Sequence, residues 1–350
     1  MSSPYSDLPA RAFWRTGVAE RARLDPGDLY VPRFPVTRRM RVATAGSCFA
    51  QHVGRALRGA GFDVIDAEPL PAAISDAVAN RFGYRLFSAR YGNIYTARHL
   101  AQLFDEAEGV ARPADPVWRR GERFFDAQRP SVEPDGLPSE ELVQAHRARH
   151  LAAVSEAFRA ADLFVFTFGL TETWIHAASN TVYPTAPGTI AGAFDPAQHR
   201  FKNYDAFEVL ADFEQFRTRL KAVNPDVRFL VTVSPVPLTA TASGSHVEVA
   251  TCYSKSVLRA VCGMLLARHE DVDYFPSYEI ITSQNACGAY FEDNRRSVTA
   301  AGVANAMGLF LRAHDVSPSA PARAGRKRKR RPAAPEDAVC EDVLLEAFAR

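Results

Sequence analysis

Short apolar runs alternate along the chain with longer segments in which apolar residues recur every three or four positions. The short runs have the length and the Val, Phe and Thr content of β-strands, at residues 41–47, 62–67, 163–168, 228–235 and 273–278. The longer segments have the period of amphipathic helices, at residues 49–61, 96–109, 139–161, 204–223, 249–269 and 298–314. Strands that alternate with helices of this length favour right-handed crossovers and a parallel sheet covered on both faces. The pattern therefore predicts an α/β fold with a sheet of about five strands.

This alternation is confined to a body at residues 41–315. Residues 1–40 are rich in Pro and Arg, show no steady period and are expected to form an N-terminal lead-in. Residues 316–336 are poor in apolar side chains, which predicts a basic disordered linker. Residues 337–350 return to an amphipathic pattern and are expected to form a short C-terminal helix.

Two stretches of the body are longer than a five-strand unit needs, at about residues 68–160 and at residues 175–204. The first has an aromatic and Pro-rich middle, and the second contains the sequence YPTAPGTIAGAFDP. Long insertions at strand ends commonly build lids or substrate walls. We therefore expect these two insertions to border a functional site.

The charge of the chain is unevenly distributed. Of 42 basic and 40 acidic side chains, eight basic and five acidic ones lie in residues 316–350, which leaves 34 basic and 35 acidic ones in the rest. The nearly neutral body has no overall field to attract nucleic acid or an anionic membrane. The run Arg326–Arg331 is the one candidate for an anionic partner, but no RNP, KH, zinc-finger or helix-turn-helix signature accompanies it. A solvated cationic tail is therefore the favoured interpretation of this run.

Cysteine content and apolar segments indicate the compartment. Five cysteines are odd in number and irregularly spaced, which excludes a disulfide framework or a zinc knuckle: Cys48, Cys252, Cys262, Cys287 and Cys340. The N-terminus lacks the apolar region of a signal peptide, and no apolar stretch is long enough to span a membrane. We expect a protein of the cytoplasm that uses no metal and no cofactor.

The residues after the first predicted strand are candidates for covalent chemistry. Ligands of an open parallel sheet bind beyond the carboxyl ends of its strands, and Gly46, Ser47 and Cys48 stand at that position. A nucleophile there would lie at a helix N-terminus, where backbone amides and the helix dipole favour a thiolate and can bind an oxyanion. The alternative is that Cys48 is a small buried apolar residue, as many single cysteines are.

The sequence resembles the GSCFA family, whose five-letter motif stands at residues 46–50. Further segments carry the resemblance between about residues 40 and 312: FSARYGNIYTARHLAQLF, FTFGLTETW, VYPTAPGTIAG, VSPVPLTAT, YSKSVLRAV, YFPSYEI and RSVTAAGV. The family looks like a divergent branch of the SGNH or GDSL hydrolases and is associated with polysaccharide biosynthesis. The resemblance implies a flavodoxin-like, doubly wound parallel sheet and a hydrolase-like site.

The resemblance also implies roles for particular residues. Aligning the GDS motif of SGNH enzymes with Gly46 puts Cys48 in the place of the nucleophile, and a shift of one residue nominates Ser47 instead. Gly92 is the candidate for the second SGNH block, where its amide, together with the Asn93 amide, would face an oxyanion hole. In the third block Thr171 replaces Asn and Glu172 replaces Asp. Glu172 would orient a histidine or cap the following turn.

The late DxxH motif of SGNH enzymes shows the largest departure. Asp293 is present, but Arg296 stands where the histidine base belongs, and arginine cannot accept a proton. Two histidines are candidates for the base. His52 lies one helical turn after Cys48, and His246 follows the fourth predicted strand on a loop rich in Ser, Gly and Thr. The alternatives are a histidine on a helix surface and a solvated loop histidine.

Cationic and aromatic side chains suggest the substrate. Lys255, Arg295 and Arg296 are candidates for binding an anionic sugar or a phosphorylated carrier, and the alternatives are a cation on a helix surface and an internal salt bridge, in which Asp293 would pair with Arg295 or Arg296. Four aromatic residues follow predicted strand ends and are candidates for stacking on sugar rings or for core packing: Tyr91, Tyr95, Trp174 and Tyr183.

These observations predict an acyl hydrolase or O-acyltransferase that acts on a carbohydrate or polysaccharide intermediate through Cys48 or Ser47, with His246 or His52 as base. A glycan- or carrier-binding protein that has lost catalysis is the alternative, because of Arg296 and the changes at Thr171 and Glu172. A third interpretation makes the basic tail the functional element, as a tether to a membrane or to nucleic acid.

Overall fold

The computed structural model describes residues 3–316 and 341–349. The predicted linker at 316–336, with its basic run, therefore lies almost entirely outside the described residues. The body contains a five-stranded parallel sheet made of β1 (Arg41–Gly46), β2 (Asp63–Val64), β5 (Leu163–Phe168), β9 (Arg228–Val233) and β10 (Val272–Tyr274). The strand order is β2-β1-β5-β9-β10, which becomes 2-1-3-4-5 when these five strands are numbered along the chain. That is an order of doubly wound α/β folds, so the predicted fold class is confirmed.

The central strand β5 shows why the sequence forms this sheet. All six of its residues are buried, as expected for a strand covered on both faces. Successive side chains alternate between the faces, so Phe164 and Phe166 join one apolar core while Leu163 and Val165 join the other. The unbroken apolar run LFVFTF is therefore typical of a central parallel strand.

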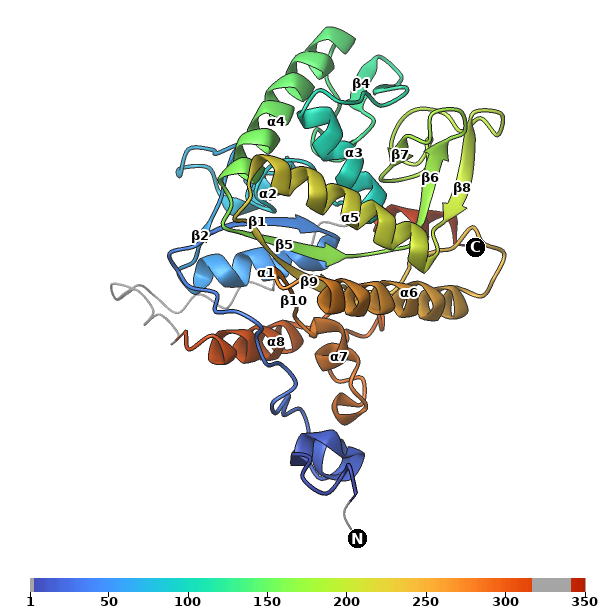
Figure 1. The fold of residues 1–350 in the computed structure, drawn as a ribbon. Coiled ribbons are helices and arrows are strands. Elements are labelled where there is room, and N and C mark those ends of the chain that lie inside the picture. The colour runs from blue at the N-terminus through green and yellow to red at the C-terminus, as the bar shows by residue number, and fades with distance from the viewer. Residues whose placement is uncertain (1–2, 317–340, 350) are drawn as a thin grey trace, which may run out of the picture.

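Helices cover both faces of the sheet (Figure 1). The core that contains Phe164 is completed by α3 (Ala97–Ala107), α4 (Glu140–Ala160), α5 (Ala206–Val223) and α6 (Val247–Arg268). The opposite core is completed by α1 (Cys48–Gly59), α7 (Ser277–Thr282) and α8 (Ala300–Ala313). A short helix, α2 (Asp76–Arg81), lies within the first insertion.

Side-chain caps define where several of these helices begin. Thr96, Ser139 and Thr299 precede α3, α4 and α8, and each side chain accepts a hydrogen bond from a backbone amide of the first turn. Asp205 precedes α5 and forms a capping box with Glu208. These polar residues stand directly before apolar periodic segments, which is why the helix boundaries follow the sequence pattern closely.

Helix α6 is the one described helix that is long and apolar enough to cross a membrane by length and composition, and 44% of its apolar window is buried inside the protein. Leu258, Val261 and Cys262 of this helix lie in the core beside the sheet. The core helix of a soluble protein meets the same criteria, so this helix is weak evidence for a membrane span.

The second insertion forms a small antiparallel sheet rather than an irregular wall. It consists of β6 (Glu172–His176), β7 (Val182–Tyr183) and β8 (His199–Asn203), in the order β7-β6-β8. This sheet stands beyond the carboxyl end of β5, on the side toward which the arrowheads of the parallel strands point in Figure 1. The insertion is therefore placed to border a site at that end of the central sheet.

Buried charges hold the first insertion in place. This insertion also contains the hairpin β3 (Val117–Arg120) and β4 (Arg123–Asp126). The Asp126 carboxylate accepts a hydrogen bond from Arg129 Nε at 2.7 Å, and Arg147 contacts both Asp126 and Glu106. Burial alone would raise the pKa of Asp126, but the Arg147 and Arg129 guanidinium groups outweigh burial and lower it. Sequence reasoning did not identify this network.

Some predicted elements differ in length or type. Strand β2 covers only two residues of the predicted 62–67 because it pairs with one neighbour, β1, at the sheet edge. The predicted last strand stops at Tyr274, since Pro276 breaks it and α7 begins at the next residue. The C-terminal segment Glu341–Phe348 is a 3-10 helix, and the lead-in contains the short helices Ala10–Ala12 and Arg15–Ala19.

Candidate functional site

The winding of the chain reverses between β1 and β5. After β1 the chain forms β2 on one side, and after β5 it forms β9 and β10 on the other. Ligands of doubly wound sheets bind in the crevice at such a point, beyond the carboxyl ends of the two strands. The segments that leave the two strands here are 46–48 and 169–172. The topology therefore brings the first and third predicted blocks together.

A sharp turn at Gly46 connects β1 to α1. The backbone φ of Gly46 is +138°, and a Cβ at this position would come 2.5 Å from Thr167 O, so a larger residue would collide with β5. The Ser47 amide donates a hydrogen bond to the same oxygen at 3.1 Å. Helix α1 then begins at Cys48. This turn fixes Ser47 and Cys48 at the helix N-terminus, as the sequence predicts.

Ser47 has an unusual environment for a serine at a helix start. It occupies the N-cap position, but its side chain makes no capping hydrogen bond. Its Oγ is buried and has no hydrogen-bond partner. Ser47 is 2% exposed and Cys48 is 5% exposed, so both candidate nucleophiles lie below the surface. A buried hydroxyl without a partner is uncommon and requires an explanation, of which a catalytic role is one.

Residues 92–95 lie against the ends of both strands. Gly92 has a left-handed φ of +70°. The Ile94 amide donates to Gly46 O at 2.8 Å, and the carbonyl of Tyr95 accepts hydrogen bonds from the Gly169 and Leu170 amides at 3.2 and 3.0 Å. The second predicted block is therefore brought to the first and the third through backbone hydrogen bonds.

Asn93 is linked to the helix that carries the candidate nucleophiles. Its Oδ1 accepts a hydrogen bond at 3.1 Å from Gln51 Nε2, and both side chains are buried. Gln51 lies three residues after Cys48, on the same side of α1. Sequence reasoning missed Gln51, although its spacing from Cys48 was a usable signal.

Helix α6 supports the third block from the other side. Ser254 Oγ accepts a hydrogen bond from the Thr171 amide at 3.1 Å, and Lys255 Nζ donates to Gly169 O at 2.7 Å. Both side chains are buried, so Lys255 does not lie on the outer surface of its helix. Thr171 itself is fully buried, and its Oγ1 has no hydrogen-bond partner. The YSKS motif thus fixes the loop after β5, and sequence reasoning identified only its lysine.

Glu172 begins β6 and borders a cavity of about 200 Å³. Its Oε1 accepts a hydrogen bond from Thr241 Oγ1 at 2.8 Å. Burial raises the pKa of Glu172, and the Thr241 hydroxyl opposes that shift. Glu172 therefore does not cap a helix; its carboxyl is held by the loop that follows β9.

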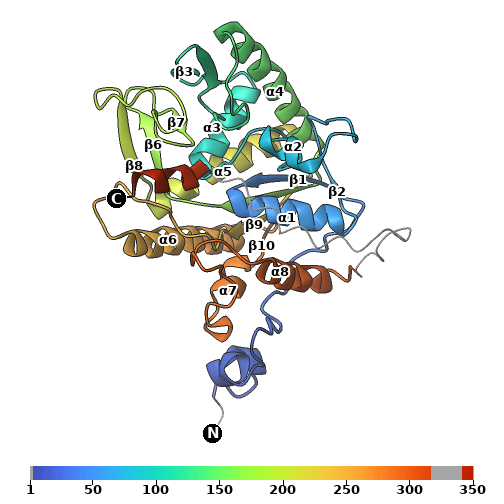
Figure 2. The ribbon, with the colours of Figure 1, turned by 180° about the vertical axis from the view of Figure 1, so that it is seen from behind.

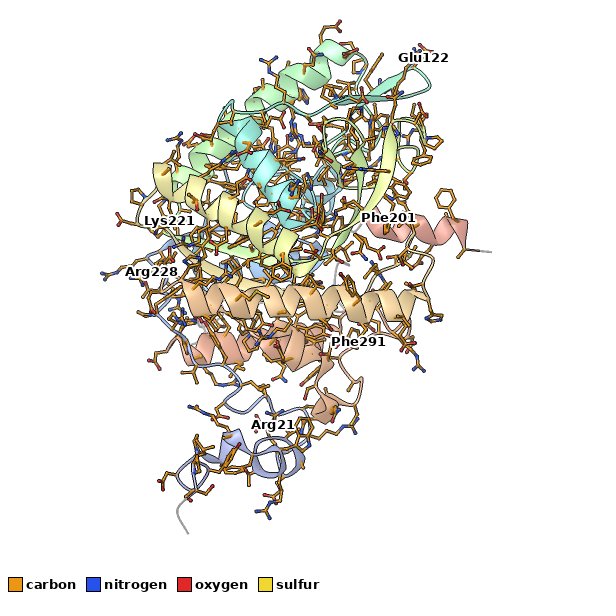
Figure 3. The ribbon with its side chains drawn as sticks, turned by 45° about the vertical axis from the view of Figure 1, so that its right-hand side comes forward. Arg21, Glu122, Phe201, Lys221, Arg228 and Phe291 are labelled. Carbon is orange, nitrogen blue, oxygen red and sulfur yellow. The ribbon has the colours of Figure 1, made fainter. Side chains whose placement is uncertain are left out.

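Four aromatic side chains define this cavity, which we call the aromatic pocket: Tyr95, Trp174, Tyr183 and Phe201. Leu238, Thr241 and Leu345 also line it. Figure 3 labels Phe201, on β8. Tyr91 does not line it, because its ring is buried in the core and its hydroxyl donates to the carbonyl of Thr44. Tyr95 connects the pocket to the crevice, since its ring also lies against Gly169.

The two candidate histidines occupy different environments. His52 is half-buried on α1, and its ring centroid lies 5.9 Å from that of Phe49. Burial, together with the nearby charge of Arg55, lowers the pKa of His52 to about 4. His246 is exposed at the N-cap of α6, where its Nδ1 accepts a hydrogen bond from the Glu248 amide at 3.2 Å. His246 and the buried Lys255 are nine residues apart, about 13 Å along a helix.

Asp293, Arg295 and Arg296 lie in a turn before α8. Asp293 and Arg295 are exposed, and Arg295 has a φ of +53°. Arg296 is half-buried, and its amide donates to Asn294 Oδ1 at 3.0 Å. In the described part of the chain no group of three His, Cys, Asp or Glu side chains is placed to hold a metal ion.

Comparison with known proteins gives one match. The model of the GSCFA family matches residues 41–310, which include every candidate site residue named above except Leu345 of the aromatic pocket. Neither a curated protein nor a solved structure matches the chain.

Proposed function

Since the chain belongs to the GSCFA family, we propose that it is an SGNH-like acyl hydrolase or O-acyltransferase that acts on a carbohydrate or polysaccharide intermediate. One observation carries this proposal above the others. Ser47 and Cys48 stand at the N-terminus of α1 in the crevice between β1 and β5, and Tyr95 connects that crevice to an aromatic pocket. Nucleophile, oxyanion donors and a sugar-sized pocket would thus be neighbours.

In the proposed reaction the nucleophile attacks the carbonyl carbon of an acyl ester. A bond forms from Cys48 Sγ, or from Ser47 Oγ, to that carbon, and the π electrons move onto the carbonyl oxygen. The backbone amides of the first turn of α1 and the Asn93 amide would stabilise this oxyanion. Collapse of the intermediate expels the sugar alkoxide, which takes up a proton. Water or a second sugar hydroxyl then attacks the acyl-enzyme and regenerates the nucleophile.

His52 is the better candidate for the base because it follows Cys48 by one helical turn. Its low pKa keeps the imidazole neutral above about pH 4, and a neutral imidazole accepts a proton. His246 would have to move, since its Nδ1 is engaged at the exposed start of α6. Lys255 would hold the loop after β5 rather than contact the substrate, because its Nζ donates to Gly169 O.

The aromatic pocket supports a carbohydrate as the substrate. Trp174, Tyr183 and Phe201 offer faces on which a sugar ring can stack, while Glu172 and Thr241 offer polar atoms for its hydroxyl groups. A volume of about 200 Å³ corresponds to one sugar ring. The Arg295 side chain is exposed and is the more accessible of the two arginines for an anionic group on the substrate.

A catalytically inactive glycan-binding protein is the second candidate. The low exposure of Ser47 and Cys48 favours it, because a substrate carbonyl must reach the nucleophile. The presence of Arg296 in the position of the SGNH histidine favours it as well. In this case the aromatic pocket would bind a glycan, and the crevice would serve only to hold the loops that border it.

Mass spectrometry of the protein after brief exposure to an activated acetyl ester separates the two candidates. We expect an acetyl adduct on residue 48 or 47 that is lost in Cys48→Ala or Ser47→Ala and slowed in His52→Gln, with no change in His246→Gln. Cys252→Ala is the matched control, since Cys252 is an exposed thiol on α6. An adduct confined to the exposed thiols, in a folded protein, would favour the binding protein.

A location in the cytoplasm and an anionic partner for Arg326–Arg331 are further parts of this proposal. Cysteine spacing supports the first, and the local charge of the run supports the second. Detection of the protein in cell fractions, and of a variant with this run neutralised, tests both.

A further inference from the structure

The C-terminal segment, Glu341–Phe348, lies at the opening of the aromatic pocket. Leu345 is one of the residues that line the pocket, together with Trp174, Phe201 and Thr241. The segment is drawn in red in Figures 1 and 2, and in both views it lies beside β6 and β8 at the carboxyl end of the central sheet. A part of the chain outside the residues that match the family model therefore covers the candidate site.

The contact depends on few side chains. Leu345 is half-buried, whereas its neighbour Leu344 is 46% exposed and Phe348 is 68% exposed. One leucine against an aromatic wall is a weak contact by itself. The chain between Val316 and Glu341 keeps the segment near the pocket, so its local concentration is high even though the contact is weak. Such a segment is able to bind and leave without unfolding the body.

The covered surface has the chemistry that the segment fits. Leu170, Trp174, Phe201 and Leu238 supply apolar walls, and Leu345 supplies the apolar side chain that meets them. The same walls are the surface on which a sugar ring would stack. Leu345 and a ligand that enters from this side therefore compete for the same space.

We infer that residues 341–348 are a tethered lid that occupies the outer part of the aromatic pocket through Leu345 and must leave before a large glycan enters. The occupant is the chain's own segment. The inference rests on the proposed function only in taking this pocket as the place where the substrate binds. The lid would restrict access to the pocket and keep water from it while closed.

Quenching of Trp174 fluorescence by acrylamide in the full-length chain tests the lid without any enzyme assay. A Trp14→Phe background removes the exposed Trp14, and Trp118 contributes little because it is 4% exposed. In this background we expect Leu345→Asp to increase the quenching of Trp174 by about twofold, because a segment held by one leucine opens easily. Leu344→Asp is the matched control, since it introduces the same charge at an exposed neighbour and should change nothing.

Addition of a peptide of residues 338–350 to the Leu345→Asp chain should restore protection of Trp174, and the same peptide with Leu345→Asp should not. Equal quenching in the parent, Leu345→Asp and Leu344→Asp chains would overturn the lid. Protection that disappears on tenfold dilution would overturn the assignment of the occupant, because the covering segment would then come from a second copy. Acetylation of Cys48 or Ser47 plays no part in these readings, so a failure of the proposed reaction leaves them interpretable.

Discussion

The Ser47 side chain lies against Gly169 so closely that a Cβ built on Gly169 would come 2.8 Å from Ser47 Cβ. It would also lie 3.1 Å from Tyr95 O, which accepts hydrogen bonds from the loop after β5. The glycine is needed for this close approach rather than for an unusual φ. The segment after the first strand and the segment after the third are therefore packed as one unit.

Gly169→Ala should lower the free energy of unfolding by about 1–3 kcal/mol, because the added methyl group overpacks this junction. Urea unfolding followed by circular dichroism measures the change. Gly59→Ala is the control, since a Cβ at Gly59 meets nothing within 4 Å near the end of α1. Equal effects of the two substitutions would contradict the close packing of Ser47 and Gly169.

Ser254→Ala should destabilise the protein by about 1–3 kcal/mol, because the buried amide of Thr171 loses its acceptor. Ser256→Ala on the same helix removes an exposed hydroxyl and should have little effect. Hydrogen exchange of the Thr171 amide gives a local measurement, with faster exchange expected in Ser254→Ala alone. Unchanged exchange in that variant would show that the hydrogen bond does not hold the loop.

His52 should make stability depend on pH. The folded state lowers the pKa of His52 to about 4, below the usual value of 6.5, so the unfolded chain binds the proton more readily. The contribution of His52 is present above pH 6.5 and is lost as the pH falls toward 4. Between pH 7 and pH 5.5 the loss amounts to about 1 kcal/mol.

His52→Gln should therefore lose less stability than the parent protein over the same pH interval, as measured by urea unfolding at both pH values. If His52 is also the base, acylation in the parent should persist down to about pH 4, where the imidazole becomes protonated. An identical pH dependence of stability in parent and variant would show that His52 is not desolvated in the folded protein.

Thr241→Val should raise the pKa of Glu172 further, because the hydroxyl that opposes the effect of burial is removed. Carbon-detected NMR titration of the glutamate carboxyl groups measures the change. Thr239→Val is the matched control, since Thr239 lines the same pocket and its buried Oγ1 has no hydrogen-bond partner. A similar Glu172 titration in both variants would show that Thr241 does not stabilise the carboxylate.

The sequence pattern predicted the parallel sheet and most helices because these elements bury continuous or periodic apolar residues. The run LFVFTF coincides with β5, where packing on both faces requires apolar side chains throughout. The pattern overestimated β2, since how many residues of an edge strand pair depends on its single neighbour. It also did not indicate that residues 172–203 form antiparallel strands, which are short and only partly buried.

The candidate site was predictable in outline and not in detail. Strand topology alone places residues 46–48 beside residues 169–172 once the strand order is known. The burial of Lys255 and the engagement of His246 at a helix start depend on the path of α6, which sequence periodicity does not give. Contacts between distant segments, such as Leu345 on the aromatic pocket, have no local signal in the sequence at all.

The two outer strands of the parallel sheet are short: Asp63–Val64 on one side and Val272–Tyr274 on the other. Beside the second, Tyr30 and the backbone of Arg33 bind the Asp273 carboxylate, and the Arg33 guanidinium donates to Val272 O at 3.2 Å. Few backbone groups are thus left for an added strand from another molecule. The N-terminal lead-in consequently acts as a guard against edge-to-edge aggregation, a task for which its irregular, Pro-rich sequence is well suited.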